Sequence, residues 1–125
     1  MKQEARKINN FTDLFAWQEA HELVVLVYKA TRDFPKEEVF GLTSQIRRAS
    51  VSISSNIAEG FGRRSKIDKA RFYVMAQGSL SEVQSQLMVA RDIDYLEKAS
   101  FDSLYSQTIT VHKLLTGLIN KTKES

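Results

Sequence analysis

A near absence of chain-turning residues is the feature that most constrains how this sequence can fold. The 125 residues include a single proline, Pro35, and only five glycines. A fold made of many short strands needs a turn after each strand, and proline and glycine form most of those turns. The sequence therefore favours long uninterrupted helices and argues against an all-β fold.

Four segments show the apolar repeat of a helix, with hydrophobic side chains recurring every three or four residues. The first begins at Thr12 or Asp13, either of which can cap a helix N-terminus, and ends before Pro35. The other three are expected at residues 42–59, 67–96 and 100–121, the last capped by Ser100. Because the links are short, neighbouring helices should be antiparallel. The predicted fold is an all-α, antiparallel up-down-up-down four-helix bundle.

The length corresponds to one domain. We expect residues 1–10 to form a flexible basic N-terminal tail, residues 11–121 to form the bundle, and residues 122–125 to form a frayed C-terminus. No run of 18 apolar residues predicts a membrane span, and the first ten residues lack the apolar segment of a signal peptide. These features favour a bacterial-type cytoplasmic protein.

The first predicted helix is apolar around much of its circumference. Leu23, Leu26, Val27 and Ala30 widen the apolar stripe beyond the face that one bundle contact requires. Two interpretations are open. These side chains could line a thicker core within the chain, or they could contact a neighbouring subunit.

Positive charge is concentrated between the second and third predicted helices. The net charge of the chain is only +3, yet residues 60–71 alone carry five cations against one carboxylate. This pattern is typical of a solvated loop and equally of a surface that attracts phosphates. The most exposed candidates for phosphate contact are expected to be Arg63, Arg64, Lys66 and Lys69. Arg47 and Arg48 come next, and because adjacent helical residues point about 100° apart, one of them could be structural.

Several polar residues occupy positions close to the predicted interior faces. They are Gln45, Asn56, Glu59, Arg71 and Glu82. A buried carboxylate needs a partner, so we expect Glu59 or Glu82 to pair with an arginine, most simply Arg71 or Arg47, and Asn56 to bridge the second and third helices. A structural role is favoured over a catalytic dyad. Replacing Glu59 with alanine should then lower the unfolding midpoint clearly.

The sequence offers little support for catalysis or for a metal site. The absence of cysteine excludes disulfides and thiol chemistry. The two histidines, His21 and His112, lie on different predicted helices, and no Glu-x-x-His occurs, which argues against a di-iron bundle site. Neither a phosphate-binding loop nor a nucleophile-elbow motif is present. We therefore expect no metal, no cofactor and no enzymatic activity.

Three long stretches carry a resemblance to a known family. They are FTDLFAW at residues 11–17, the stretch at residues 34–63 that contains QIRR and SNIAEG, and RFYVMAQGSLSEVQSQLMVA at residues 71–90. Together they closely resemble the 23S rRNA intervening-sequence proteins, also called the S23-type or four helix bundle protein family. The resemblance covers about residues 11–120. The family is also similar to the accessory variability determinant of diversity-generating retroelements.

The resemblance implies an oligomeric bundle. The accessory variability determinant is a pentamer that binds nucleic acid and a reverse transcriptase, so by analogy we expect a homopentamer. The sequence and the resemblance together favour a non-enzymatic scaffold that binds RNA or DNA with little sequence preference. The alternative is a protein-interaction adaptor, for example for a reverse transcriptase, that uses Glu19, Glu22 and Asp33 and makes no direct nucleic-acid contact.

Overall fold

Four long helices make up most of the protein. The computed structural model describes residues 6–124, and no strand occurs among them. The helices are α1 (Phe15–Thr31), α2 (Leu42–Phe61), α3 (Lys66–Asp92) and α4 (Lys98–Glu124), with short 3-10 helices η2 (Phe11–Asp13) and η3 (Lys36–Glu38). The all-α prediction is confirmed. Residues 1–5 of the expected N-terminal tail and Ser125 lie outside the described residues.

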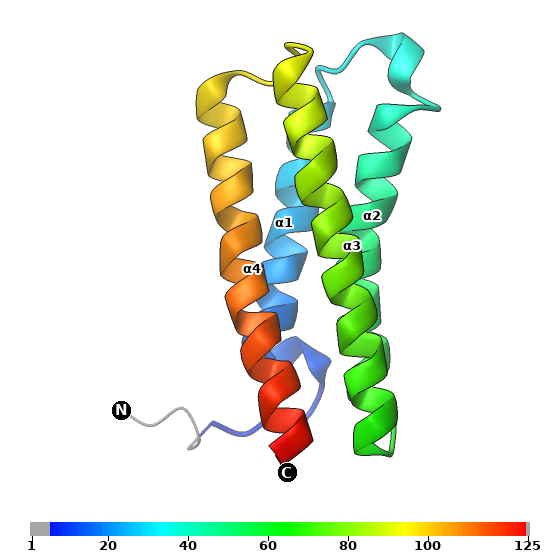
Figure 1. Ribbon diagram of the computed structural model, residues 1–125, viewed down its shortest axis with the longest axis vertical. Helices are drawn as coiled ribbons and strands as arrows, with labels where there is room; N and C mark the ends of the chain where they lie inside the picture. Colours follow the sequence, from blue (N-terminus) through cyan, green and yellow to red (C-terminus); the bar gives the residue numbers. More distant parts are fainter. Residues whose placement is uncertain (1–5, 125) are drawn as a thin grey trace.

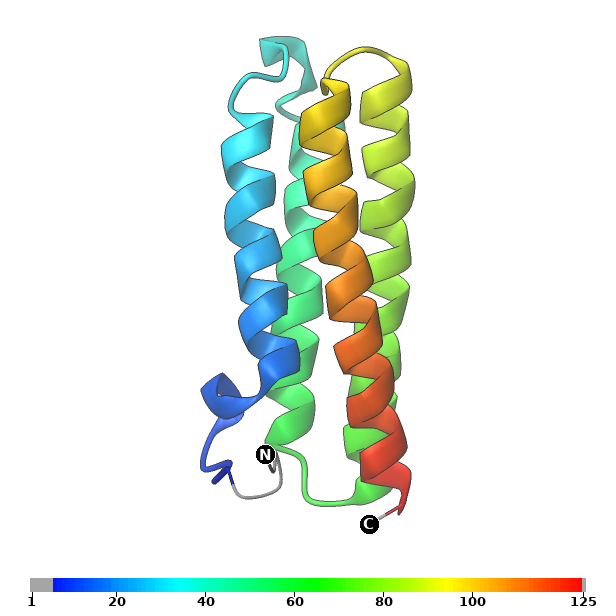
Figure 2. The ribbon, with the colours of Figure 1, turned by 90° about the vertical axis from the view of Figure 1, so that its left-hand side faces the viewer.

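The four helices lie side by side along one axis (Figure 1). α1 and α3 each contact both α2 and α4, and the most extensive contact is between α2 and α3. The α2–α3 turn, the start of α1 and the end of α4 lie at one end, here called the turn end (Figures 1 and 2). The α1–α2 and α3–α4 connections lie at the other end, here called the loop end.

The core is formed by the apolar faces that the sequence pattern predicts. α2 buries Ile46, Ala49, Ile53 and Ile57. The other helices contribute a continuous set of buried side chains, including Leu23, Val27, Ala76, Leu80, Val83, Leu87, Leu104, Val111 and Leu115. Burying a side chain of this size stabilises the fold by roughly 1.5–3 kcal/mol, so these interleaved faces dominate the stability.

The broad apolar surface of α1 faces the protein's own core. Leu23 and Val27 are fully buried, and Leu26 and Ala30 pack half-buried against the core cluster. Of the two interpretations of this surface, the thicker internal core is the one that the packing supports. Leu23 and Val27 are therefore not accessible to another subunit.

The helix ends differ from the predicted ones for local reasons. Asn10, and not Thr12 or Asp13, is the capping residue, and it caps η2, so α1 begins only at Phe15. α3 ends at Asp92 because Asp94 adopts a left-handed conformation with φ of 66°, which stops the helix before Leu96. α4 starts before Ser100, at Lys98, and runs through residues 122–124 of the expected frayed end.

One carboxylate joins three segments at the loop end. Glu38 accepts a hydrogen bond from the backbone N–H of Leu42 at 3.0 Å and another from the hydroxyl of Tyr95 at 2.8 Å. The Leu42 N–H and then the Tyr95 hydroxyl lower the pKa of Glu38, because both stabilise the ionised carboxylate. The same hydroxyl contact raises the pKa of Tyr95.

Replacing Glu38 with alanine should therefore lower the thermal midpoint in a pH-dependent way. The folded-state pKa of Glu38 lies below its ordinary value, so its contribution is present above the ordinary pKa and is lost as the pH falls through the lowered pKa. Thermal melts at neutral and acidic pH would measure the effect. The exposed neighbour Glu37 is the control. An equal loss at both pH values would contradict this role.

Candidate nucleic-acid interface

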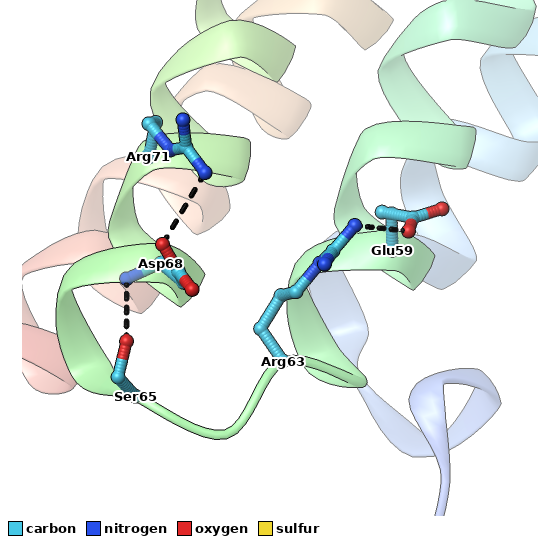
Figure 3. Close-up of polar contacts among 5 residues, drawn as sticks. All are labelled: Glu59, Arg63, Ser65, Asp68 and Arg71. Carbon is cyan, nitrogen blue, oxygen red and sulfur yellow. Dashed lines mark hydrogen bonds and ion pairs between the residues drawn. The ribbon is translucent and has the colours of Figure 1, made fainter.

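The α2–α3 turn is tightly built. At the last turn of α2, a Cβ added to Gly60 would lie 2.8 Å from Tyr73 Cε1 and 2.9 Å from Phe72 Cβ, so only glycine lets the two helices approach this closely. The N–H of Gly62 then closes α2 by bonding to the carbonyl of Glu59 at 3.1 Å. Ser65 begins α3 by accepting the N–H of Asp68 at 3.1 Å (Figure 3). The cations in between are therefore carried on a short connection whose two ends are closed by hydrogen bonds.

Two cations on this turn are free to contact a ligand. Arg64 and Lys66 are exposed, and neither has a side-chain hydrogen bond or ion pair among residues 6–124. Lys66 is also the first residue of α3, where the helix dipole adds partial positive charge. Arg64 and Lys66 are therefore the side chains best placed to meet a phosphate.

Arg63 and Arg71 are partly engaged with carboxylates. Arg63 pairs with Glu59 at 2.6 Å, and Arg71 pairs with Asp68 at 3.3 Å (Figure 3). The guanidinium of Arg63 also lies over the ring of Phe72, 4.5 Å from its centroid. Both arginines keep large exposed side-chain fractions, 41% and 66%. Each can still add positive potential at the surface, although its charge is partly balanced.

Lys69 has a structural contact that the sequence did not reveal. Its ammonium donates to the carbonyl of Phe61 at 2.6 Å and lies 5.1 Å from the centroid of the same ring. This bond satisfies a carbonyl at the C-terminus of α2, where a cation is favoured. The side chain is half-buried, so the expectation that Lys69 is among the most exposed cations is wrong.

The fold adds further cations to the same end of the bundle. Lys121 and Lys123 lie in the last turn of α4, which ends beside the start of α1 and at the same end as the α2–α3 turn (Figures 1 and 2). Arg6 and Lys121 also line one hollow around Gly117. Lys121 and Lys123 lie more than 50 positions after the α2–α3 turn, and the up-down-up-down helix order that the sequence predicts is what would bring them to the same end.

Arg47 and Arg48 do not belong to this surface. At a rise of 1.5 Å per residue, Arg48 lies about 20 Å along α2 from its end at Phe61. Arg47 Nε donates to Thr31 Oγ1 at 2.8 Å, and its guanidinium stacks over Tyr28 at 4.6 Å, so Arg47 connects α2 to α1. Arg48 is exposed. The expectation that one of this pair is structural is confirmed, and that residue is Arg47.

The prediction that Glu59 or Glu82 pairs with an arginine is met by Glu59, but the partner is Arg63 and neither Arg71 nor Arg47. Glu59 is 54% exposed and pairs with Arg63, one helical turn away. Glu82, also exposed, accepts a hydrogen bond from the Gln86 amide at 3.3 Å. These carboxylates lie on the surface, so neither requires the buried cation that the sequence argument assumed.

The polar link between α2 and α3 is made by two serines. The hydroxyls of Ser52 and Ser79 lie 2.8 Å apart, and the Asn56 amide donates to the Ser52 carbonyl at 2.9 Å and to the Ser52 hydroxyl at 3.1 Å. Asn56 therefore supports the bridge from its own helix and does not span the two helices. Gln45 and Arg48 lie farther along α2, beside Glu82, in a shallow hollow.

Within the described part of the chain, no three histidine or acidic side chains gather as a set of metal ligands. None of its helices is both long and apolar enough to cross a bilayer. The chemistry available at the turn end is therefore that of exposed cations on a rigid support.

Comparison with known proteins places these features in a family. The sequence matches the family described as "23S rRNA-intervening sequence protein" over residues 12–117. The fold is similar to the crystal structure of a protein of unknown function from the S23 ribosomal protein family of Bacteroides thetaiotaomicron. That comparison has a TM-score of 0.75 and 22% sequence identity, and covers 83% of this chain and 97% of the other. No curated protein matches significantly.

The close approach of α2 and α3 at Gly60 can be tested by adding a methyl group at this position. Gly60→Ala should lower the free energy of unfolding by about 1–3 kcal/mol, because the new methyl group overlaps Tyr73 and Phe72. Gly62→Ala is the matched control, since its Cβ would meet nothing closer than 3.6 Å. Urea titrations of both variants would measure the difference. Equal midpoints would show that the turn can relax around an extra methyl group.

The exposed Glu59–Arg63 pair should contribute little to stability. Glu59→Ala is expected to change the free energy of unfolding by less than about 1 kcal/mol, because surface ion pairs are screened by water. Urea unfolding of Glu59→Ala measures this directly. A loss comparable to that of Gly60→Ala would restore the original expectation of a strong structural role for Glu59.

Proposed function

The chain belongs to the 23S rRNA-intervening sequence protein family, and we propose that it is a non-enzymatic scaffold that binds RNA or DNA with little sequence preference. The observation that carries this proposal is the pair of exposed, unpaired cations Arg64 and Lys66 on the rigid α2–α3 turn. The binding surface is the turn end of the bundle, where these cations are joined by Arg63, Arg71, Lys121 and Lys123.

The geometry favours contact with phosphates over contact with bases. The rings of Phe61 and Phe72, on either side of the turn, are half-buried, and each already has a cation over one face. Lys69 lies over Phe61, and Arg63 lies over Phe72. Stacking on bases requires a free aromatic face, whereas phosphate contact requires only exposed cations. Binding of this type depends strongly on salt and weakly on sequence.

Assembly would strengthen this weak patch. We propose that the helices run antiparallel in up-down-up-down order and that the bundles form a homopentamer, the state implied by similarity to the accessory variability determinant. The alternation of the connections between the two ends supports this helix order (Figures 1 and 2). A ring would present several basic turn ends together, and simultaneous contacts raise the apparent affinity for a long polyanion.

A protein-interaction adaptor with no direct nucleic-acid contact is the second candidate, and one surface feature favours it. Phe40 is 95% exposed and Val39 is 51% exposed, at the loop end of the bundle. An exposed aromatic side chain on a folded support is typical of a protein-docking surface. Of the acidic residues expected to take part, Glu22 and Asp33 are exposed, while Glu19 accepts a hydrogen bond from Gln107 at 2.9 Å.

Neutralising the two free cations tests the primary proposal. The double variant Arg64→Ala and Lys66→Ala should bind generic duplex DNA more weakly. The slope of log affinity against log salt concentration should become shallower by about 0.9 for each lost phosphate contact, or roughly 1.8 in total. Fluorescence anisotropy at several salt concentrations, on duplex DNA and on RNA, measures both quantities.

The matched control removes two exposed cations from the other half of the molecule. Lys29→Ala and Arg32→Ala, near the end of α1, change the net charge equally and should leave the salt slope unchanged. Equal weakening by both pairs would mean that overall charge, and not the turn end, governs binding. Wild-type protein that binds no nucleic acid even at low salt would overturn the proposal and favour the adaptor.

A further inference from the structure

A hollow with a volume of about 460 Å³ opens beside Gly117, where the start of α1 and the end of α4 lie together at the turn end (Figures 1 and 2). We call it the Gly117 hollow. Its walls come from the chain before η2, from the start of α1 and from the second half of α4. Sites for small organic ligands span about 300–1,000 Å³, so this hollow has the size of such a site.

The floor of the Gly117 hollow is apolar. Leu14 is buried, and Leu114 and Leu118 pack half-buried against the core cluster. Ile8 and Phe15 complete the lining, and they remain 39% and 37% exposed. An apolar ligand that covered these side chains would remove their surface from water, which is favourable.

Gly117 keeps the centre of the hollow open. Lys113, Gly117 and Lys121 recur at steps of four residues, so they share one face of α4. No heavy atom lies within 4 Å of the position that a Cβ would take at Gly117. The two lysines are therefore separated by a gap about 12 Å long along the helix axis, at a rise of 1.5 Å per residue.

Every charged side chain that lines the hollow is a cation. Arg6 donates a hydrogen bond to the carbonyl of Asp13 and lies over Phe15, 3.7 Å from the ring centroid, so it is held in the wall. Lys113 and Lys121 are exposed, and neither has a side-chain hydrogen bond or ion pair among residues 6–124. No carboxylate of the described chain lines the hollow. An apolar floor is thus bordered by positive charge without a matching anion.

We propose that the Gly117 hollow binds a long-chain carboxylate, such as a fatty acid. Its alkyl chain lies over the apolar floor, and its carboxylate pairs with the lysines at the border. This inference goes beyond nucleic-acid binding and does not depend on it, since Arg64 and Lys66 do not line the hollow.

Other occupants match the hollow less well. A nucleic-acid phosphate could pair with the lysines, but it would leave Ile8 and Phe15 in water. Two turns of a partner helix, about 10 Å wide and 11 Å long, occupy roughly 850 Å³, nearly twice the volume of the hollow. A single alkyl chain with an anionic head satisfies both the apolar floor and the cationic border.

Calorimetric titration with sodium dodecanoate, below its micelle concentration and at neutral pH, tests the binding. We expect saturable binding of one molecule per chain. Acetate carries the charge alone and dodecyl maltoside carries the alkyl chain without the charge, so both should bind far more weakly. Each buried methylene is worth about fourfold in affinity, so decanoate should bind roughly fourfold to sixteenfold more weakly than dodecanoate.

Filling the hollow locates the site. Gly117→Leu places an apolar side chain in the gap and should weaken dodecanoate binding by about tenfold or more, because the alkyl chain is displaced. Gly78→Leu is the matched control, since Gly78 of α3 is equally open and does not line the hollow. Leucine is a better helix former than glycine, so both variants should fold, and thermal melts verify this.

Removing the border charges tests the role of the lysines. The double variant Lys113→Gln and Lys121→Gln should weaken dodecanoate binding roughly fivefold, because two exposed ion pairs are lost. Its binding of dodecyl maltoside should not change. Lys29→Gln with Arg32→Gln lowers the net charge equally, away from the hollow, and should leave the dodecanoate affinity unchanged.

Three results would overturn this proposal. Equal dodecanoate binding by the wild type and Gly117→Leu would show adsorption elsewhere on the protein. Wild-type protein that ignores dodecanoate but sediments with phosphatidylglycerol vesicles would show a membrane-docking surface instead. Protein that binds neither would show that the hollow takes no amphiphile. In each case the proposed nucleic-acid binding stands or falls separately, by the anisotropy of the Arg64 and Lys66 variant.

Discussion

The packing of α2 against α3 is the contact on which the candidate site depends. It is the most extensive helix pair, and it becomes tightest at Gly60, where Tyr73 and Phe72 occupy the space of a side chain. Burial at this point raises the pKa of Tyr73 to about 12, because the phenolate would lose its hydration. The turn that follows spans only residues 62–65, and its cations Arg63 and Arg64 are exposed.

The same packing decides which cations are free. Lys69 is held by the Phe61 carbonyl that α2 leaves open at its end, and Arg63 lies between Glu59 and the ring of Phe72. Arg64 and Lys66 fall between these anchored residues and have no such partner among residues 6–124. A cluster of five cations therefore separates into structural and available members, which local sequence could not distinguish.

The two ends and the side of the bundle offer different chemistry. The turn end gathers cations from three segments of the chain, the loop end exposes Phe40, and Val74 and Met75 of α3 are about half exposed on the side. A surface that attracts phosphates is poorly suited to self-association, and an apolar surface is poorly suited to phosphates. These surfaces lie on different parts of one bundle.

Sequence periodicity predicted four helical segments with apolar faces, and helix geometry places Ile46, Ile53 and Ile57 on one buried side of α2. Helix ends were predicted less accurately. Asp94 stops α3 through its backbone conformation, and Asn10 caps η2 through a hydrogen bond, and neither leaves a periodic pattern. The polar residues were predicted less well. Glu59 has a local partner, Arg63, one helical turn away, whereas the contact of Arg47 with Thr31 of α1 depends on how the helices pack.

The sequence by itself determined the all-α class, the approximate helices, the basic segment between the second and third helices and the family. These follow from local periodicity, from composition and from long ordered stretches of residues. Only the tertiary structure decided that Arg47 binds Thr31 of α1 and that the hydroxyls of Ser52 and Ser79 meet between α2 and α3. Each of these depends on how far apart two side chains lie after packing, and the linear order of residues does not encode that distance directly.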